Sequence, residues 1–130
     1  GNLGSVVLDT DESRTITLSF GVNILDADKV RLGKGSLLSF DGDGFWAVIR
    51  TSSFSTRKFA DIEGGVPILF LLTGPGPSVK VSAFSDLFEV GVLAPERTVR
   101  LAGEAHIEAI FARKALLLGV DLFGSSFEPF

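Results

Sequence analysis

The chain has 130 residues, enough for one domain with a real core, and its net charge of −4 argues against the basic face of a nucleic-acid-binding protein. Cysteine is absent, which excludes disulfides, thiol nucleophiles and thiolate metal sites. No apolar run approaches the ~20 residues that cross a bilayer, so we expect a soluble protein without a membrane span, with the cytoplasm as its default compartment. The chain begins without methionine, and we expect it to be processed or trimmed.

The aromatic composition favours self-association. The chain contains 12 Phe, one Trp and no Tyr, and 45% of its residues are hydrophobic. A small β domain cannot easily bury so many Phe side chains alone, and monomers rarely expose large apolar patches. We therefore expect a homo-oligomer.

The first half of the chain predicts short strands joined by turns. Residues 1–5 are expected to be a loose tail, and residues 14–20 alternate apolar and polar side chains, which is typical of a half-buried strand. The segment Asp41-Gly42-Asp43-Gly44 predicts a hairpin, because Asp-Gly pairs favour tight turns. A calcium loop is the alternative there, although the third acidic position and the distal Glu of an EF-hand are missing.

The second half contains the most apolar stretch. Residues 57–63 predict one or two helical turns that end at two glycines. Residues 66–73 predict a buried strand, and two glycines and two prolines at 74–77 force a turn. Residues 78–84 alternate again, so we expect a central hairpin here. Further strands are expected at 87–93, 97–101, 104–111 and 115–123, followed by a loose tail at 124–130.

A weak internal repeat links the two halves. The segment at 28–33 is echoed at 96–103, and each copy has an acid, then basic residues interleaved with Val and Leu, then glycine. Two similar β units favour a sandwich or barrel of stacked hairpins. A chance likeness between short strand–turn units is the alternative.

Two candidate sites emerge. On a strand, Glu104, His106 and Glu108 share one face, and one His with two carboxylates can hold a divalent metal in a cupin-like enzyme. A solvated strand face with a structural His106 is the alternative. Trp46, beside Phe45, is a candidate platform for a small ligand or glycan, with a core position as the alternative. No catalytic residue and no cofactor are predicted, because neither a nucleophile elbow nor a phosphate loop occurs.

Two segments also carry a resemblance to a known family. Residues 30–43 (VRLGKGSLLSFDGD) resemble the strand–turn opening of the altered-inheritance-of-mitochondria family, and residues 69–76 (LFLLTGPG) resemble its following strand and turn. The likeness covers about residues 28–84. It implies a double-stranded β-helix, a trimer or larger ring, and no established catalytic residues. That fold is shared by the tryptophan-binding RNA attenuator protein, whose last strand pair is similar to residues 99–114, although the acidic charge here does not favour RNA binding.

These features predict a single all-β domain over residues 1–130. We expect a double-stranded β-helix or a jelly-roll-like sandwich with at most one short helix. The expected function is an oligomeric interaction or scaffold module, with further copies of the chain or another protein as partners and no nucleic acid. A metal-dependent enzyme and a small-ligand or glycan-binding module are the alternatives.

Overall fold

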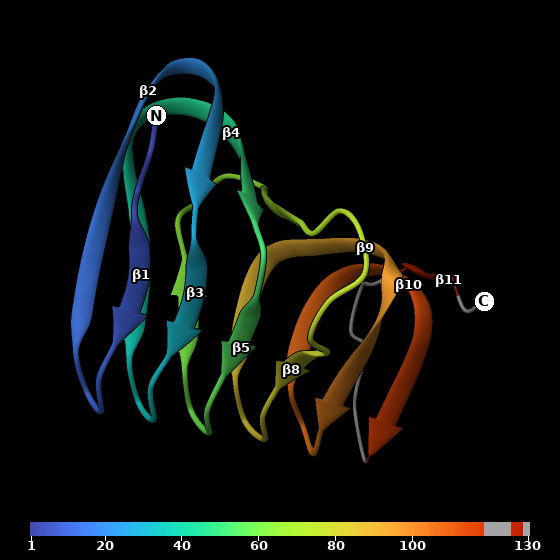
Figure 1. The fold of residues 1–130 in the computed structure, drawn as a ribbon. Coiled ribbons are helices and arrows are strands. Elements are labelled where there is room, and N and C mark those ends of the chain that lie inside the picture. The colour runs from blue at the N-terminus through green and yellow to red at the C-terminus, as the bar shows by residue number, and fades with distance from the viewer. Residues whose placement is uncertain (119–125, 129–130) are drawn as a thin grey trace.

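A computed structural model of the chain describes residues 1–118 and 126–128. Over these residues the chain forms eleven strands and no helix, so no helix there is long and apolar enough to cross a membrane. Every strand pair is parallel, and the chain winds as a three-sided β-solenoid whose coils stack along one axis (Figure 1). The strands are β1 (Ser5–Leu8), β2 (Ser13–Ala27), β3 (Lys29–Leu32), β4 (Leu37–Thr51), β5 (Phe54–Thr56), β6 (Asp61–Glu63), β7 (Ile68–Leu71), β8 (Val79–Val81), β9 (Asp86–Ala102), β10 (His106–Leu118) and β11 (Ser126–Glu128).

Three parallel sheets form the sides of the solenoid. Face A contains β1, β3, β5, β8 and the last parts of β9 and β10. Face B contains the first parts of β2 and β4, then β6, and the first parts of β9 and β10. Face C contains the second parts of β2 and β4, then β7, the middle parts of β9 and β10, and β11. The long strands therefore bend around corners of the solenoid instead of ending there.

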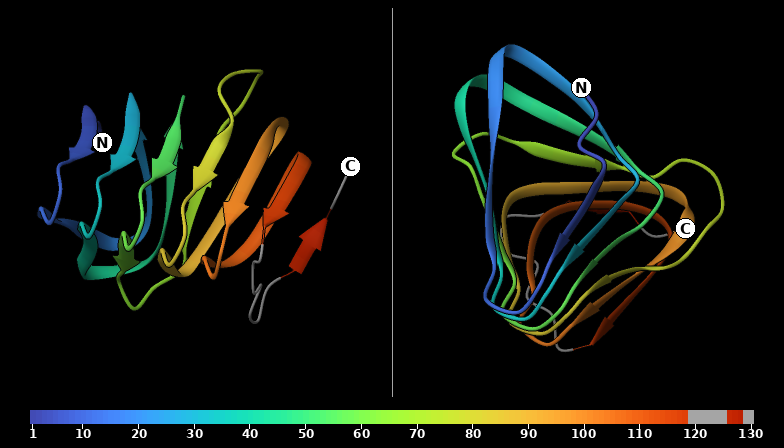
Figure 2. Two further views of the ribbon diagram at one scale, coloured as in Figure 1. Left: turned by 90° about the horizontal axis from the view of Figure 1, so that it is seen from below. Right: turned by 60° about the vertical axis from the view of Figure 1, so that its left-hand side comes forward.

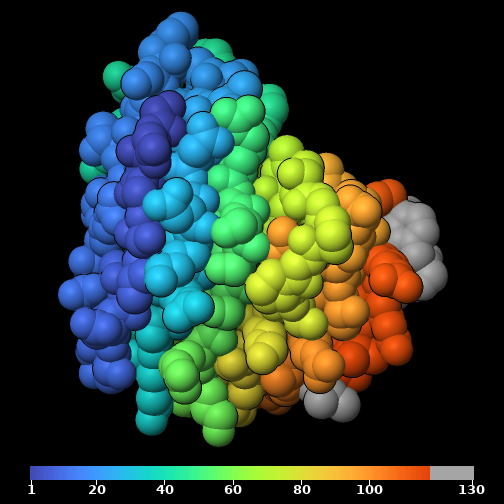
Figure 3. All heavy atoms as spheres, viewed as in Figure 1, coloured from blue at the N-terminus to red at the C-terminus, as the bar shows by residue number. Residues whose placement is uncertain are grey.

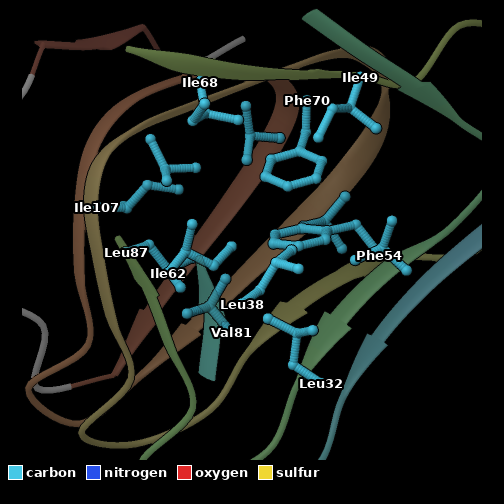
Figure 4. Close-up of a cluster of buried hydrophobic side chains, with 14 of the residues drawn as sticks. Leu32, Leu38, Ile49, Phe54, Ile62, Ile68, Phe70, Val81, Leu87 and Ile107 are labelled. Carbon is cyan, nitrogen blue, oxygen red and sulfur yellow. The ribbon is translucent and has the colours of Figure 1, made fainter. Parts of the chain in front are cut away.

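Side chains at equal positions in successive coils fill the interior. Because side chains alternate along a strand, every second residue of each face points inward. Phe54 of face A stacks on Phe70 of face C, with ring centroids 4.3 Å apart. Figure 4 shows apolar side chains from the three faces meeting in this core. One inward column of face A, in which no residue is more than 1% exposed, consists of Val6, Val30, Phe54, Val79 and Val99.

The corner between faces A and B is a stack of five β-turns. In each turn the fourth residue donates its backbone N–H to the carbonyl of the first, as Ser36 does to Gly33 at 3.1 Å. The third residue has a positive φ, which costs an L residue roughly 1–2 kcal/mol. Phe59 and Phe84 hold this position in adjacent turns, and their stacked rings, 5.1 Å apart, help to offset that cost. The third residues are, in order, Asp11, Gly35, Phe59, Phe84 and Glu104.

The coils shorten toward the C-terminus. Val6 and its partner Val30 are 24 residues apart, Val79 and Val99 are 20 apart, and Val99 and Ala115 are 16 apart. Face A keeps its width, so faces B and C contain fewer residues in the later coils. The first two coils consequently project beyond the later ones at the corner between faces B and C (Figure 2).

The two predicted hairpins are wrong. β7 pairs with β4 and β9, whereas β8 pairs with β5 and β9, so the two strands of the expected central hairpin are not partners. The segment at 41–44 lies inside β4, where the chain bends from face B to face C. Glycine and proline occur where a strand bends around a corner of the solenoid as readily as where the chain reverses in a hairpin. In this solenoid the partner of each strand lies one coil away in the sequence. Glycine is still required at Gly42, where φ is 96° and a Cβ would collide with the carbonyl oxygen of Leu18.

The all-β prediction is confirmed, but its finer forms are wrong. A jelly roll and a double-stranded β-helix are built from antiparallel strands, whereas the pairs in the described residues are parallel. The helix expected at 57–63 is instead a β-turn followed by β6. At the N-terminus, the Leu3 N–H donates to the Asp26 carbonyl at 2.7 Å, which ties the first residues to β2. Of the tail expected at 124–130, β11 pairs with β10, and the rest lies outside the described residues.

The internal repeat is confirmed in an extended form. Its two copies place Val30 and Val99 in one inward column and Arg31 and Arg100 in the outward column beside it. The strands of face A in the other coils occupy the same columns with less similar residues. The repeat therefore indicates successive coils of a solenoid and not a pair of hairpin units.

Candidate functional surfaces

The outward surface of face C is apolar. The outward column Ile24, Val48, Leu69, Gly91 and Ala109 crosses five strands, from β2 to β10, without one charged residue. Contiguous apolar surfaces of this kind on soluble proteins mark interaction sites. With the neighbouring outward positions, the surface that we name the apolar patch consists of Val22, Ile24, Trp46, Val48, Leu69, Leu71, Leu93, Ala109 and Phe111, all of which are partly or largely exposed.

An ion pair bounds the apolar patch on one side. The Nε and Nη2 of Arg50 donate to Oδ1 and Oδ2 of Asp26 at 2.7 and 2.9 Å. The hydrogen bond from Arg50 holds the pKa of the Asp26 carboxyl below its usual value. Both side chains are about half exposed, so the pair adds little to stability and mainly marks where the apolar surface ends.

The apolar patch continues onto the projecting corner between faces B and C. There Phe20 and Phe45 meet edge to face with ring centroids 5.0 Å apart, and they are 78% and 59% exposed. The buried side chain of Asn23 fixes the bend, because it accepts the N–H of Ser19 and donates to its carbonyl, both at 2.9 Å. Trp46 follows Phe45 and is 40% exposed, so it lies at the surface and not in the core. Its role as a ligand platform stays a prediction.

The residues predicted to hold a metal come together only in part. Oε1 of Glu108 lies 3.2 Å from Nε2 of His106, and Nδ1 of His106 lies 3.0 Å from Oδ1 of Asp86 on the neighbouring strand. Glu104 precedes β10, in the last β-turn of the stack between faces A and B. Within residues 1–118 and 126–128, no group of three or more acidic or His side chains is arranged to hold a metal ion. The metal site therefore stays a prediction, and the geometry instead makes His106 a bridge between two carboxylates.

The row that contains His106 extends across face B to a pair of acids. Asp61 and Asp86 are direct neighbours in register, and the Asp86 N–H donates to Oδ1 of Asp61 at 3.3 Å. Burial, together with the charge of Asp86, raises the pKa of the Asp61 carboxyl above its usual value. Face B thus contains a like-charge pair whose repulsion is partly offset by a backbone N–H and by His106.

Face A has the opposite charge. Its strands carry no Asp or Glu among the described residues, but they carry Lys29, Arg31, Lys80, Arg100 and Lys114. Sequence reasoning did not bring these five residues together, because they lie on four separate strands, β3, β8, β9 and β10, and gather only when the chain coils. The available signal was the recurrence of a basic residue between two inward apolar ones, as in Val30-Arg31-Leu32 and Val99-Arg100-Leu101.

No protein-family model, no curated protein and no solved structure matches this chain.

Proposed function

We propose that the protein is a self-associating β-solenoid scaffold module in which the apolar patch of face C packs against the apolar patch of a second copy. The observation that carries this proposal is the outward column of face C, which crosses five strands without a charge. The exposed rings of Phe20 and Phe45 extend the same surface. Covering this surface removes apolar area from water, which is the main favourable term in protein association.

The size of the apolar patch suits a reversible dimer. Five strands ~4.8 Å apart, with about five residues of ~3.3 Å on each, give a projected area on the order of 300 Å². Side-chain relief and the aromatic corner increase the accessible area beyond this projection. Two such surfaces together approach the lower end of specific interfaces, about 1,200 Å² in total, which is the size range of weak and transient complexes.

The presence of one apolar face favours two-fold symmetry. In a two-fold dimer both subunits use the same surface, whereas a ring needs two different contact surfaces on each chain. The outward strands of the other faces carry charges, such as Lys80 on face A and Asp86 on face B, which suit solvent. We therefore propose a dimer in place of the trimer or larger ring that the family resemblance implies.

A charge placed in the middle of the apolar patch tests this proposal. Leu69 points outward from β7, so Leu69→Lys should leave the core intact while placing an unpaired ammonium group inside the interface. We expect sedimentation velocity to show a dimer for the unsubstituted chain and at least about 100-fold weaker association for the variant. Thr17→Lys, at an exposed outward position of β2 on face B, is the matched control and should leave association unchanged.

Two results would contradict the proposal. One is a chain that stays monomeric at every accessible concentration, and the other is a Leu69→Lys variant that associates as strongly as Thr17→Lys. A trimer that Leu69→Lys dissociates would overturn the two-fold arrangement while leaving face C as the contact surface. Circular dichroism of both variants confirms that the fold is retained.

A further inference from the structure

An open trough crosses the outward surface of face A. It has a volume of about 940 Å³, and Figure 3 views the molecule from this side. Neighbouring strands lie ~4.8 Å apart, so five strands span ~19 Å. An extended ligand laid across the strands would meet one outward side chain from each coil. From β1 to β9 the outward column in the floor of the trough consists of Val7, Arg31, Ser55, Lys80 and Arg100.

The trough is lined by cations that have no acidic partner. Its lining residues include Arg31, Arg57, Lys80 and Arg100, all exposed, against a single acid, Asp9. In the part of the chain that the structure describes, none of these four cations forms an ion pair. Four such charges on one side of a chain with a net charge of −4 form a local positive surface that attracts anions.

Two of these cations are also direct neighbours. Lys80 of β8 and Arg100 of β9 share a register position, and like charges side by side on adjacent strands destabilise a sheet. Face B contains the comparable pair of Asp61 and Asp86, but there a backbone N–H and His106 bind the carboxylates. No such bond to Lys80 or Arg100 occurs among the described residues. A bound anion would supply the missing compensation.

A buried arginine anchors the loop that leads into one wall of the trough. Arg97 is 4% exposed, and it donates from Nε to the Gly74 carbonyl at 3.1 Å and from Nη2 to the Thr73 carbonyl at 3.3 Å. Its Nη1 donates to the carbonyl of Ser52, which joins this loop to the corner of the solenoid. Pro77, at the end of the same loop, lines the trough. The loop that leads to Pro77 is therefore anchored at its start, which reduces the ordering cost of binding.

The remaining lining residues indicate the class of anion. Ser53, Ser55, Ser78 and Ser82 are partly exposed there, and hydroxyl groups both donate to and accept from the hydroxyls of sugars. Arginine matches the two oxygens of a carboxylate with parallel N–H donors. Single-stranded nucleic acid is instead held by exposed aromatic rings on which its bases stack. The one aromatic residue of the lining, Phe54, is buried in the core.

We propose that the trough binds a linear acidic glycan, a chain of sugars with uronate carboxylates, laid across the strands of face A. Its carboxylates pair with Arg31, Lys80 and Arg100, and its hydroxyls bond to the serines between them. The trough lies on a different face from the apolar patch. Glycan binding is therefore independent of self-association.

Calorimetric titration with an oligogalacturonate tests the assignment. The double variant Lys80→Ser/Arg100→Ser removes the neighbouring cations, and we expect it to bind at least about tenfold more weakly than the unsubstituted chain. The matched control is Lys34→Ser/Lys58→Ser, which removes the same net charge from the β-turn stack outside the trough and should bind normally. Binding should also weaken as salt is raised, because exposed charges are screened.

Three outcomes would overturn this inference. They are equal binding of an uncharged galactan of the same length, undiminished binding by the trough variant, and tighter binding of single-stranded DNA than of the oligogalacturonate. The Leu69→Lys variant should bind the oligogalacturonate as the unsubstituted chain does. If that variant dissociates but still binds the glycan, then self-association and glycan binding are separate properties of two faces.

Discussion

Faces A and C are built from the same coils, yet their outward surfaces have opposite chemistry. Both place apolar columns inward, such as the one that contains Phe54 on face A and the one that contains Phe70 on face C. Outward, the strands of face A carry cations and hydroxyls without an acid in the described residues, whereas those of face C from β2 to β10 are apolar up to the Asp26–Arg50 pair. The inward columns therefore specify the solenoid, and the outward columns specify what each face contacts.

The largest expected effect tests the difference between inward and outward positions. Phe54→Ala removes a ring that is 1% exposed and stacked on Phe70, so the free energy of unfolding should fall by about 3–5 kcal/mol. Phe20→Ala is the control, because Phe20 is 78% exposed, and the change should stay within about 1 kcal/mol. Denaturant unfolding of dilute protein measures both. Equal losses at the two positions would mean that the coil is not packed as described.

A smaller effect should distinguish face A from an ordinary charged surface. Lys80→Ser relieves the repulsion between Lys80 and Arg100, so without ligand it should raise the free energy of unfolding by up to about 1 kcal/mol at low salt. The gain should shrink as salt is added, because screening removes the same repulsion. Lys58→Ser, in the β-turn stack, is the control and should have no comparable effect. A loss of stability in Lys80→Ser would indicate a compensating partner for Lys80.

The smallest effect concerns face B. The pKa of Asp61 is raised on folding, so the folded chain binds the proton more tightly than the unfolded chain, whose Asp pKa is near 3.8. The ionised carboxylate of Asp61 therefore opposes folding. As pH rises from about 3.8 through the raised pKa of Asp61, the free energy of unfolding of the wild-type chain falls.

Asp61→Asn keeps the acceptor for the Asp86 N–H but cannot ionise. At neutral pH it should be more stable than the wild type by less than about 1 kcal/mol, since the site is partly exposed. That difference should vanish at pH values below about 3.8. Thermal unfolding across this range measures it, and a difference that grows toward low pH would contradict the assigned sign.

The strands themselves were largely predictable, but their partners were not. The alternation at 14–20 and the apolar run at 66–73 correctly indicated strands in β2 and β7. Alternation is the same in a hairpin and in a solenoid, however, so it cannot show whether the partner is antiparallel and adjacent or parallel and one coil away. The β-turn stack was also not predictable, because Phe59 and Phe84 occupy positions of positive φ, where glycine is normally expected.

The candidate surfaces were predictable to different degrees. The excess of Phe indicated exposed apolar surface, but the coiling distributes the exposed rings: Phe111 lies within the apolar patch and Phe20 and Phe45 lie beside it, whereas Phe59 and Phe84 lie in the β-turn stack. Trp46 was singled out, and it does lie at the surface beside Phe45. His106 and Glu108 are brought together, but the expected alignment of Glu104 assumed one continuous strand, whereas the chain turns there. The residues that line the trough come from separate coils, so no local sequence motif predicts that they lie together.

Fluorescence of Trp46, the single tryptophan of the chain, tests the covering of face C most directly. Trp46 is 40% exposed in the isolated chain and lies within the apolar patch. We predict that its emission shifts to longer wavelength on dilution, with the same midpoint as dissociation of the dimer, and that Leu69→Lys shows the long-wavelength emission at every concentration. Emission that is independent of concentration in a protein that still associates would place the contact elsewhere and contradict the account.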